Sequence, residues 1–413
     1  MINQFYSNPR ALQRVHEGPL GPYMDMFATY LHEKGYAQFT GHSQIRVIAK
    51  LSKWLEQRKL QIGDLDEKKI DEFILSRKHS GPLRHGEVAA LYRSLEQLRR
   101  VGAIRAPAPA KVAEGPLDRI EGAFKKYLEQ DRGLVRKTIE RYLPFVHQFL
   151  LECFSQTPVT FSKLCANDVT GFVLRHARDH GPRSAKFMVS ALRSFLRFLR
   201  MRGEISTELA ACVPAVAEWR LATLPRSLEP EQVERLLESC DRRTLCGKRD
   251  YAILLLLARL GLRAGEVTTL TLEDIDWKAG ELTIRGKGAR QNRLPLPNDV
   301  GRALVTYLKK GRPRCLSRRF FIRSCAPLTG FANQLAVSAI VRRVFLRAGI
   351  CTPHKGAHVL RHSLANRMLK RGASLREIGA ILRHQHPDTT AIYAKVDLTS
   401  LREIAWPWPG SKS

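Results

Sequence analysis

Acidic residues are scarce in this chain. Its 413 residues include 39 Asp and Glu against 69 Lys and Arg, which gives a formal net charge of +30. Such an excess creates a long-range positive field suited to a polyanion, and nucleic acid is the partner it favours most. A ribosome-associated or membrane-surface protein stays open on composition alone. Hydrophobic residues make up 44%, as in a globular rather than a disordered protein.

Long hydrophobic runs are also missing. The longest apolar stretch, residues 251–262, is interrupted by Arg259 and is too short to cross a bilayer. We therefore expect no membrane association. The eight cysteines are scattered and form no Cys-x-x-Cys pair, which argues against a zinc ribbon and a disulfide framework. We expect these thiols to be small core residues of a protein in the reducing cytoplasm.

Two kinds of nucleic-acid enzyme lack their signatures here. No cluster of carboxylates has metal-ligand spacing, which disfavours a two-metal nuclease. No Gly-x-x-x-x-Gly-Lys-Ser/Thr loop is present, which disfavours nucleotide-driven action. We expect the protein to use neither a metal ion nor another cofactor.

Two proline-containing stretches divide the chain. Residues 103–116 contain three prolines and no amphipathic period, and residues 213–230 contain three more. The predicted organisation is an N-terminal helical domain (1–105), a linker (106–117), a second helical domain (118–212), a linker (213–228) and a C-terminal domain (229–413).

The first two domains look like copies of one another. Similar residues recur at an offset that stays between 98 and 101. The matching pairs are Gly35 with Gly133, Ser80-Gly81-Pro82 with His180-Gly181-Pro182, Arg93-Ser94 with Arg193-Ser194, and Gly102 with Gly203. Agreement of several pairs in register indicates an internal duplication of a small helical domain.

A basic stripe follows the predicted helix 183–202 of the second domain. At 100° per residue the apolar side chains fall on one side and four cations fall within a narrow arc opposite: Lys186, Arg193, Arg197 and Arg200. We predict that this arc contacts DNA phosphates, although a solvated basic face would have the same pattern. Glu87 and Glu96 dilute the corresponding helix of the first copy, which favours weaker DNA binding or protein contacts there.

The C-terminal domain mixes helices with a little sheet. Residues 229–262 and those from 338 onward have helical patterns, and residues 281–284 and 292–296 are typical of strands joined by a turn. Ser374 and Glu377 form a capping box at the start of another helix. The predicted fold class is mainly α with a small antiparallel β-sheet (α+β).

Six residues of complementary chemistry occur in order within this domain: Arg263, Lys287, His358, Arg361, His384 and Tyr393. Two guanidiniums can grip the oxygens of a phosphodiester and stabilise its transition state. A tyrosine hydroxyl attacks phosphorus once a base takes its proton, and a lysine in a hairpin turn can protonate the leaving hydroxyl.

These residues lie in strings that together resemble the tyrosine recombinase (phage integrase) family. The strings are Leu-Gly-Leu-Arg-Ala-Gly-Glu (260–266), Gly-Lys-Gly-Ala-Arg-Gln-Asn-Arg-Leu-Pro-Leu (286–296), His-Val-Leu-Arg-His-Ser (358–363) and Leu-Arg-His-Gln-His-Pro-Asp-Thr-Thr-Ala-Ile-Tyr (382–393). The catalytic resemblance covers about residues 225–408. Residues 118–205 look like the family's helical core-binding (SAM-like) domain.

The resemblance implies a role for each of the six residues. Arg263 and Arg361 would bind the scissile phosphate, and Lys287 would protonate the leaving 5′-oxygen. His384 would hydrogen-bond the phosphate.

His358 would act as general acid/base near the nucleophile, and Tyr393 would attack to give a 3′-phosphotyrosyl intermediate. His362 and His386 are interpreted as neighbours without a role. Two departures from the family pattern flank the second histidine: Arg383 replaces the usual glycine before it, and Gln385 replaces the usual serine after it.

A site-specific DNA recombinase of a mobile element is the function that the resemblance implies. It would act on double-stranded recombination sites as a dimer or tetramer, alone or with sister recombinase subunits. Two alternatives stay open: a type IB topoisomerase-like enzyme, and a catalytically idle DNA-binding accessory subunit.

Overall fold

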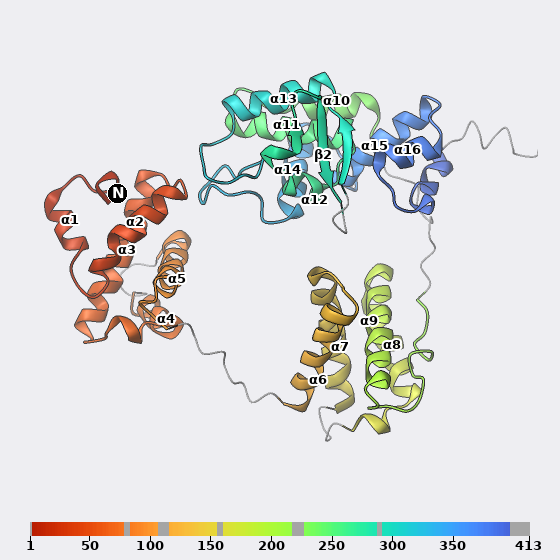
Figure 1. Ribbon diagram of the computed structural model, residues 1–413, viewed down its shortest axis with the longest axis horizontal. Coiled ribbons are helices and arrows are strands. Elements are labelled where there is room, and N and C mark those ends of the chain that lie inside the picture. Colours follow the sequence, from red (N-terminus) through yellow and green to blue (C-terminus); the bar gives the residue numbers. More distant parts are fainter. Residues whose placement is uncertain are drawn as a thin grey trace, which may run out of the picture. The chain divides into compact units, whose positions relative to one another are not determined.

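Helices dominate the computed structural model (Figure 1), which describes residues 2–77, 83–105, 115–154, 160–216, 227–286 and 291–396. Its contacts divide the chain into two compact units, one of residues 1–106 with 223–413 and one of residues 107–222. A single three-stranded antiparallel sheet lies among the described residues. The predicted class, mainly α with a small antiparallel sheet, is confirmed.

The second helical domain consists of α6 (Pro116–Lys126), a π-helical turn (Tyr127–Asp131), α7 (Arg136–Phe154), α8 (Ala166–Asp179) and α9 (Pro182–Met201). The predicted helix 183–202 is therefore confirmed to within one residue at each end. Its apolar stripe lies in the domain core, where Met188, Leu192 and Phe195 are fully buried. The cations of α9 stand on the opposite side because the apolar residues repeat at helical spacing.

The N-terminal domain repeats this order of helices. After α1 (Pro9–Val15) come α2 (Met24–Glu33), α3 (Gln38–Gln57), α4 (Glu67–Ser76) and α5 (His85–Arg100). In each domain the second helix of the repeat packs against the fourth, α3 against α5 and α7 against α9. Left-handed glycines occupy matching turns, Gly102 with φ +74° after α5 and Gly203 with φ +75° after α9. The repeated order supports the internal duplication.

Burial gives the register of the last helices of the two repeats. The buried positions of α5 match those of α9 at a constant offset of 101: Glu87, Ala90, Leu91, Ser94, Leu95 and Leu98 correspond to Met188, Ala191, Leu192, Phe195, Leu196 and Leu199. The predicted match of Arg93 with Arg193 is therefore wrong by one residue. Tyr92 is the structural counterpart of Arg193, because the core side chains and not the cations determine which face of the helix turns inward.

The C-terminal domain begins with α10 (Pro230–Glu238), α11 (Leu245–Arg259) and α12 (Ala264–Thr269). The sheet follows, with β1 (Ile275–Asp276), β2 (Glu281–Arg285) and β3 (Gln291–Pro295), and the domain continues with α13 (Asn298–Lys310), α14 (Gln334–Arg347), α15 (Ala357–Lys370) and α16 (Leu375–Leu382). The strands are ordered β1-β2-β3, and Leu282 of β2 faces Leu294 of β3.

Two details of this domain differ from the prediction. Residues 229–262 form two helices rather than one, because the Thr244 hydroxyl caps α11 by accepting the Gly247 amide at 2.9 Å. The strand β1 has only two residues, too few to leave a sequence pattern. The two predicted strands and the capping box of α16 are confirmed.

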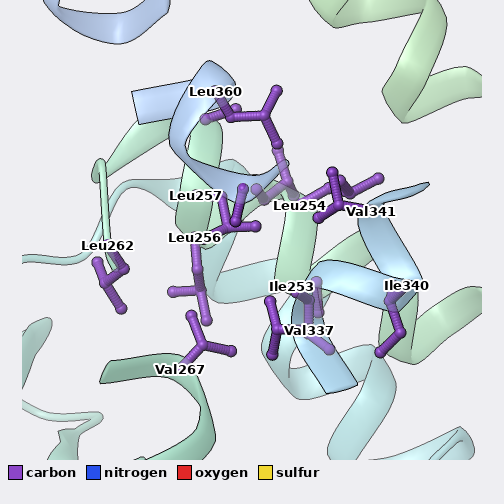
Figure 2. Packing of buried hydrophobic residues seen from close by; sticks show 14 of the residues in the cluster. Ile253, Leu254, Leu256, Leu257, Leu262, Val267, Val337, Ile340, Val341 and Leu360 are labelled. Atoms are coloured by element: carbon purple, nitrogen blue, oxygen red, sulfur yellow. The ribbon is translucent and has the colours of Figure 1, made fainter. Parts of the chain in front are cut away.

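Helix α11 is the centre of the domain. Every residue from Ala252 to Ala258 is buried, and α13, α14 and α15 pack around it. Figure 2 shows Leu254, Leu256 and Leu257 of this helix among side chains of the surrounding elements. A helix that is apolar on all sides needs such complete cover. It thereby fixes the loop that follows it and the neighbouring helix α15, both of which carry predicted catalytic residues.

The expectation that the cysteines are core residues is wrong for four of the eight, and three others are only partly buried. Only Cys240 is buried, whereas Cys165, Cys246, Cys325 and Cys351 are exposed, and all eight thiols are free. The small cysteine side chain fits loops and helix ends as well as a core, so the amino-acid composition does not determine which cysteines are buried. No helix in the described part of the chain has the length and apolar character needed to span a bilayer.

Candidate active site

A glycine turn places the first arginine of the site. Helix α11 ends at Arg259, and Gly261 then takes φ +59°. A Cβ at this position would lie 2.7 Å from Cδ2 of Leu382 and 3.0 Å from Cδ2 of Leu364, so both the backbone conformation and the packing require glycine. The turn delivers Arg263 to the N-cap of α12, where its amide donates to Glu266 at 2.8 Å.

The second arginine is buried between two loops. Arg361 lies on α15 with 5% of its surface exposed, and its guanidinium donates to the carbonyls of Gly261 and Leu382. Burial, and then repulsion from Arg263 and Arg383, lower the pKa of Arg361 to about 10. The guanidinium is still a cation at neutral pH, and its hydrogen bonds to the two carbonyls fix its orientation.

One carboxylate is shared by two further guanidiniums. Glu266 accepts from Arg263 Nη1 at 2.8 Å through one oxygen and from Arg383 Nη2 at 3.0 Å through the other. Burial acts to raise the pKa of Glu266, but Arg383 and Arg263 outweigh it and hold the pKa below its usual value. Three guanidiniums therefore stand against one carboxylate, and the surplus positive charge suits a phosphodiester.

Arg383 adopts a conformation that usually belongs to glycine. It ends α16 with φ +56° and ψ +47°, the left-handed cap position, and its side chain is 5% exposed. The family pattern has glycine here, so the sequence indicated only an added charge near the site. The structure shows that Arg383 forms an ion pair with Glu266, so this carboxylate divides its negative charge between Arg383 and Arg263.

The predicted nucleophile meets a histidine that the sequence analysis left without a role. Tyr393 lies on the 3₁₀ helix Ala391–Val396, is 1% exposed, and has its hydroxyl 2.8 Å from Nδ1 of His362. Burial raises the pKa of Tyr393 to about 12, and the nearby Arg361 acts in the opposite direction. Burial, followed by repulsion from His358 and Arg361, lowers the pKa of His362 to about 4.

A neutral imidazole therefore faces a protonated phenol near pH 7. With its proton on Nε2, His362 accepts the Tyr393 hydroxyl through Nδ1. Such a pair is the arrangement needed to remove a proton as the phenol attacks.

His384 ties the loop after α16 to the start of the tyrosine segment. Its Nδ1 lies 2.7 Å from the hydroxyl of Thr390, which directly precedes the 3₁₀ helix of Tyr393. Burial, and then repulsion from Arg361 and Arg263, lower the pKa of His384 to about 4. His358 is the second residue of α15, exposed, and one turn before His362 on the same face.

The structure thus brings together Arg263, Arg361, His384 and Tyr393 around α15 and α16, with His358 at the near end of α15. Lys287 lies outside the described residues. Helical spacing was the signal that could have pointed to His362, since it is four residues after His358 on one helix. His386 is exposed, as expected of a neighbour.

The basic arc of α9 is largely available at the surface of its own domain. Lys186, Arg197 and Arg200 are exposed, and Arg200 also pairs with Glu208. Arg193 is half-buried and donates to the carbonyl of Val213 at 2.8 Å, so it also fixes the chain that leaves the domain. DNA contact by these four residues stays a prediction.

Among the described residues no group of three or more His, Cys, Asp and Glu is placed to hold a metal ion.

Comparison with known proteins agrees with this geometry. Residues 226–399 match the model of the phage integrase family, and residues 122–203 match its N-terminal SAM-like domain. A Sinorhizobium fredii protein named as an integrase/recombinase (y4rA) is 44% identical over 99% of this chain and 99% of its own. The chain belongs to the phage integrase family. Tyrosine recombinase XerD of Listeria innocua is 31% identical over 68% of this chain and 95% of its own.

A solved structure shares the fold of this phage integrase family member. The XerH site-specific recombinase bound to its palindromic difH substrate superposes with a TM-score of 0.56, at 19% identity, over 81% of this chain and 93% of that one. With relatives named as integrase/recombinase and tyrosine recombinase, the chain is a site-specific DNA recombinase, an enzyme that exchanges DNA strands, as the sequence predicted. The comparisons favour neither the topoisomerase-like alternative nor the idle accessory subunit.

Proposed function

We propose that this integrase family member cuts and rejoins double-stranded DNA at paired sites through a 3′-phosphotyrosyl intermediate on Tyr393, for integration or transposition of a mobile element. The observation that carries the proposal is the 2.8 Å contact between the Tyr393 hydroxyl and His362, one residue along α15 from the buried Arg361. Nucleophile, proton acceptor and phosphate-binding cation are thus provided by two adjacent elements.

Charge stabilisation falls to the arginines. Arg361 and Arg263 would each bind non-bridging oxygens of the scissile phosphate and stabilise the pentavalent transition state. The backbone bonds of Arg361 to Gly261 and Leu382 hold it in place before DNA arrives, so little reorganisation is required. Arg263 stands half-exposed, with 41% of its side chain open to solvent and therefore to the substrate.

Proton transfer needs one acceptor and one donor. His362 would take the phenolic proton as Tyr393 forms its bond to phosphorus, and the expelled 5′-oxygen would receive a proton from Lys287. His358, one turn earlier, would act as acid/base on the same side, and His384 would hydrogen-bond the phosphate. Because a phosphotyrosyl ester replaces a phosphodiester, the bond energy is conserved and rejoining needs neither metal nor nucleotide.

Assembly follows from the symmetry of such sites. XerH binds a palindromic substrate, and a palindrome presents two equivalent half-sites to two protomers. We propose that this chain pairs in the same way on its own sites, as a dimer that assembles into a tetramer, with or without sister recombinase subunits. We place it in the cytoplasm, associated with the nucleoid when bound.

The three-domain organisation belongs to the same proposal. Separate hydrophobic clusters lie within residues 2–104, 120–213 and 228–360, which supports the boundaries predicted from the prolines. A small fourth cluster surrounds Tyr393.

A covalent-trapping assay tests the proposed chemistry. The protein is mixed with nicked duplexes made from the DNA that flanks its gene, and products are separated on a denaturing gel beside Tyr393→Phe. We expect a protein–DNA band with the native enzyme and none with the variant. A band of equal strength in the variant would remove Tyr393 from its role. Tight binding without any band would indicate either that a sister recombinase subunit is required or that the chain is the idle accessory subunit.

A further inference from the structure

The duplicated N-terminal domain lacks the basic arc of α9. In the structural register the four cations Lys186, Arg193, Arg197 and Arg200 correspond to His85, Tyr92, Glu96 and Arg99 on α5. Only one of the four positions has kept a permanent positive charge.

The charges on this face of α5 are balanced within the domain. Arg99 forms two hydrogen bonds to the Glu67 carboxylate, at 2.7 and 2.9 Å. Glu96 pairs with Arg100 at 3.0 Å, and the Tyr92 hydroxyl donates to Asp71. The carboxylates of Glu67, Asp71 and Glu96 lower the positive potential of this face and with it the attraction for phosphates.

A different helix carries the surplus cations of this domain. Arg46, Lys50 and Lys53 are exposed on α3 at the i, i+4 and i+7 positions of one face. They extend over two helical turns, about 10.5 Å. We call these three residues the α3 basic face. Arg77, at the C-terminal end of α4, lies close enough to Lys50 to affect its titration.

Electrostatic repulsion at this face is only partly relieved within the domain, by the single carboxylate of Glu87. Burial, and then the charges of Arg77 and Arg46, lower the pKa of Lys50, while Glu87 opposes them. Glu87 is 3.7 Å from Arg46 and is the carboxylate that the structure places beside these cations. Lys50 and Lys53 form no salt bridge among the described residues, and the Nε of Arg77 is buried there without a hydrogen-bond partner.

The second domain does not share this feature. The turn glycines Gly35 and Gly133 and the buried positions of α3 and α7 match at an offset of 98. At that offset the α3 basic face corresponds to Pro144, Gln148 and Leu151. The two copies have therefore diverged so that each presents its cations from a different helix, α9 in one and α3 in the other.

We propose that the α3 basic face is a second DNA-binding surface, which holds the phosphate backbone of duplex DNA. It rests on the proposed function, because the substrate of that function supplies the duplex. Phosphates spaced along a strand match a row of cations on one helix, and binding them relieves the repulsion that the free domain leaves in place. An acidic protein surface would offer fewer and less regular charges.

The test is the salt dependence of DNA binding by the full chain. One variant, Arg46→Ala/Lys50→Ala/Lys53→Ala, removes the face. A matched control, Arg10→Ala/Arg14→Ala/Lys68→Ala, removes three exposed cations elsewhere in the same domain. Binding to a long duplex of mixed sequence is measured at several salt concentrations, and thermal unfolding of each protein is recorded.

Log affinity decreases with log salt concentration, and we expect this negative slope to become less steep by about 2.7 in the α3 variant, which is 0.9 per lost phosphate contact. The slope of the control should be that of the native protein. The unfolding temperature of the α3 variant should not fall, since repelling charges have been removed. Equal slopes in all three proteins would overturn the proposal, and so would an equal decrease in the control. A change in self-association alone would assign the face to a protein contact instead.

Failure of the proposed function would look different. Covalent trapping depends on Tyr393 and not on the α3 basic face. If the proposed chemistry failed, no covalent product would form, whereas the salt slopes of DNA binding would still differ between the α3 variant and the control. Conversely, the α3 variant should still form the covalent product on a nicked duplex when DNA is saturating.

Discussion

Replacing His362 with alanine separates the geometry at Tyr393 from the roles that the family resemblance implies. The Tyr393 pKa of about 12 lies about five units above neutral pH, so about one phenol in 10⁵ is ionised without help. A base in hydrogen-bond contact typically accelerates such a step by about 10²–10⁴. We therefore expect His362→Ala to slow formation of the covalent complex by that factor at pH 7, at saturating DNA.

The pH profile gives the same reasoning a second readout. In the native enzyme the acceptor must be unprotonated, and its pKa is about 4, so the rate should be level from about pH 5 to about pH 8, where the donor Lys287 is still protonated. In His362→Ala hydroxide must take the proton instead, so the rate should climb about tenfold per pH unit above neutrality. A reduced rate that stays level with pH would indicate only a structural role.

Two controls complete this experiment. His386→Ala removes an exposed histidine nearby and should leave rate and profile unchanged. Thermal unfolding should show that His362→Ala lowers the free energy of unfolding by about 1–3 kcal/mol, because the buried Tyr393 hydroxyl loses its hydrogen-bond partner. Rates are compared at a temperature at which both proteins are folded. A native rate in His362→Ala, with the loss appearing in His358→Ala instead, would refute the assignment and return the base to His358.

Three further predictions follow from burial and charge. Arg361→Lys removes the planar guanidinium that can bind a phosphate through two hydrogen bonds, so it should slow cleavage by about 10²–10³. DNA affinity, measured by filter binding, should change little. An equal loss of affinity would contradict a role in the transition state. Leu256→Ala, at a fully buried position of α11, should lower the free energy of unfolding by about 2–5 kcal/mol in urea titrations, and a loss below about 1 kcal/mol would contradict its central place. His362 and His384 have folded pKa values of about 4, below the ordinary 6.5, so their contribution to stability is present above pH 6.5 and is lost as the pH falls toward 4. Replacing both with glutamine should therefore reduce the decrease in Tm between pH 6.5 and pH 4. An unchanged decrease in Tm would show that other groups cause it.

The sequence predicted the elements that have strong local signals. Helix α9 was found from its apolar period, α16 from the Ser374–Glu377 capping box, and β2 and β3 from two short runs around a glycine turn. These signals depend on neighbours within a few residues, so tertiary packing has little power to alter them.

Contacts between distant residues were harder to predict. The His362–Tyr393 hydrogen bond joins positions 31 apart, and it exists because the 3₁₀ helix of Tyr393 packs on α15. The ion pair of Arg383 with Glu266 spans 117 positions and could be predicted only as an added charge. The one-residue error in matching α5 to α9 had a related cause, because the shared cations suggested a register that the buried side chains do not follow.

The most direct test of the central claim is to identify the two atoms that the covalent bond joins. The trapped complex is digested with protease and nuclease, and mass spectrometry locates the modified residue and the DNA end attached to it. The account predicts a peptide in which Tyr393 carries a 3′-phosphate nucleotide. A nucleotide on another residue, or a link through a 5′-phosphate, would contradict it.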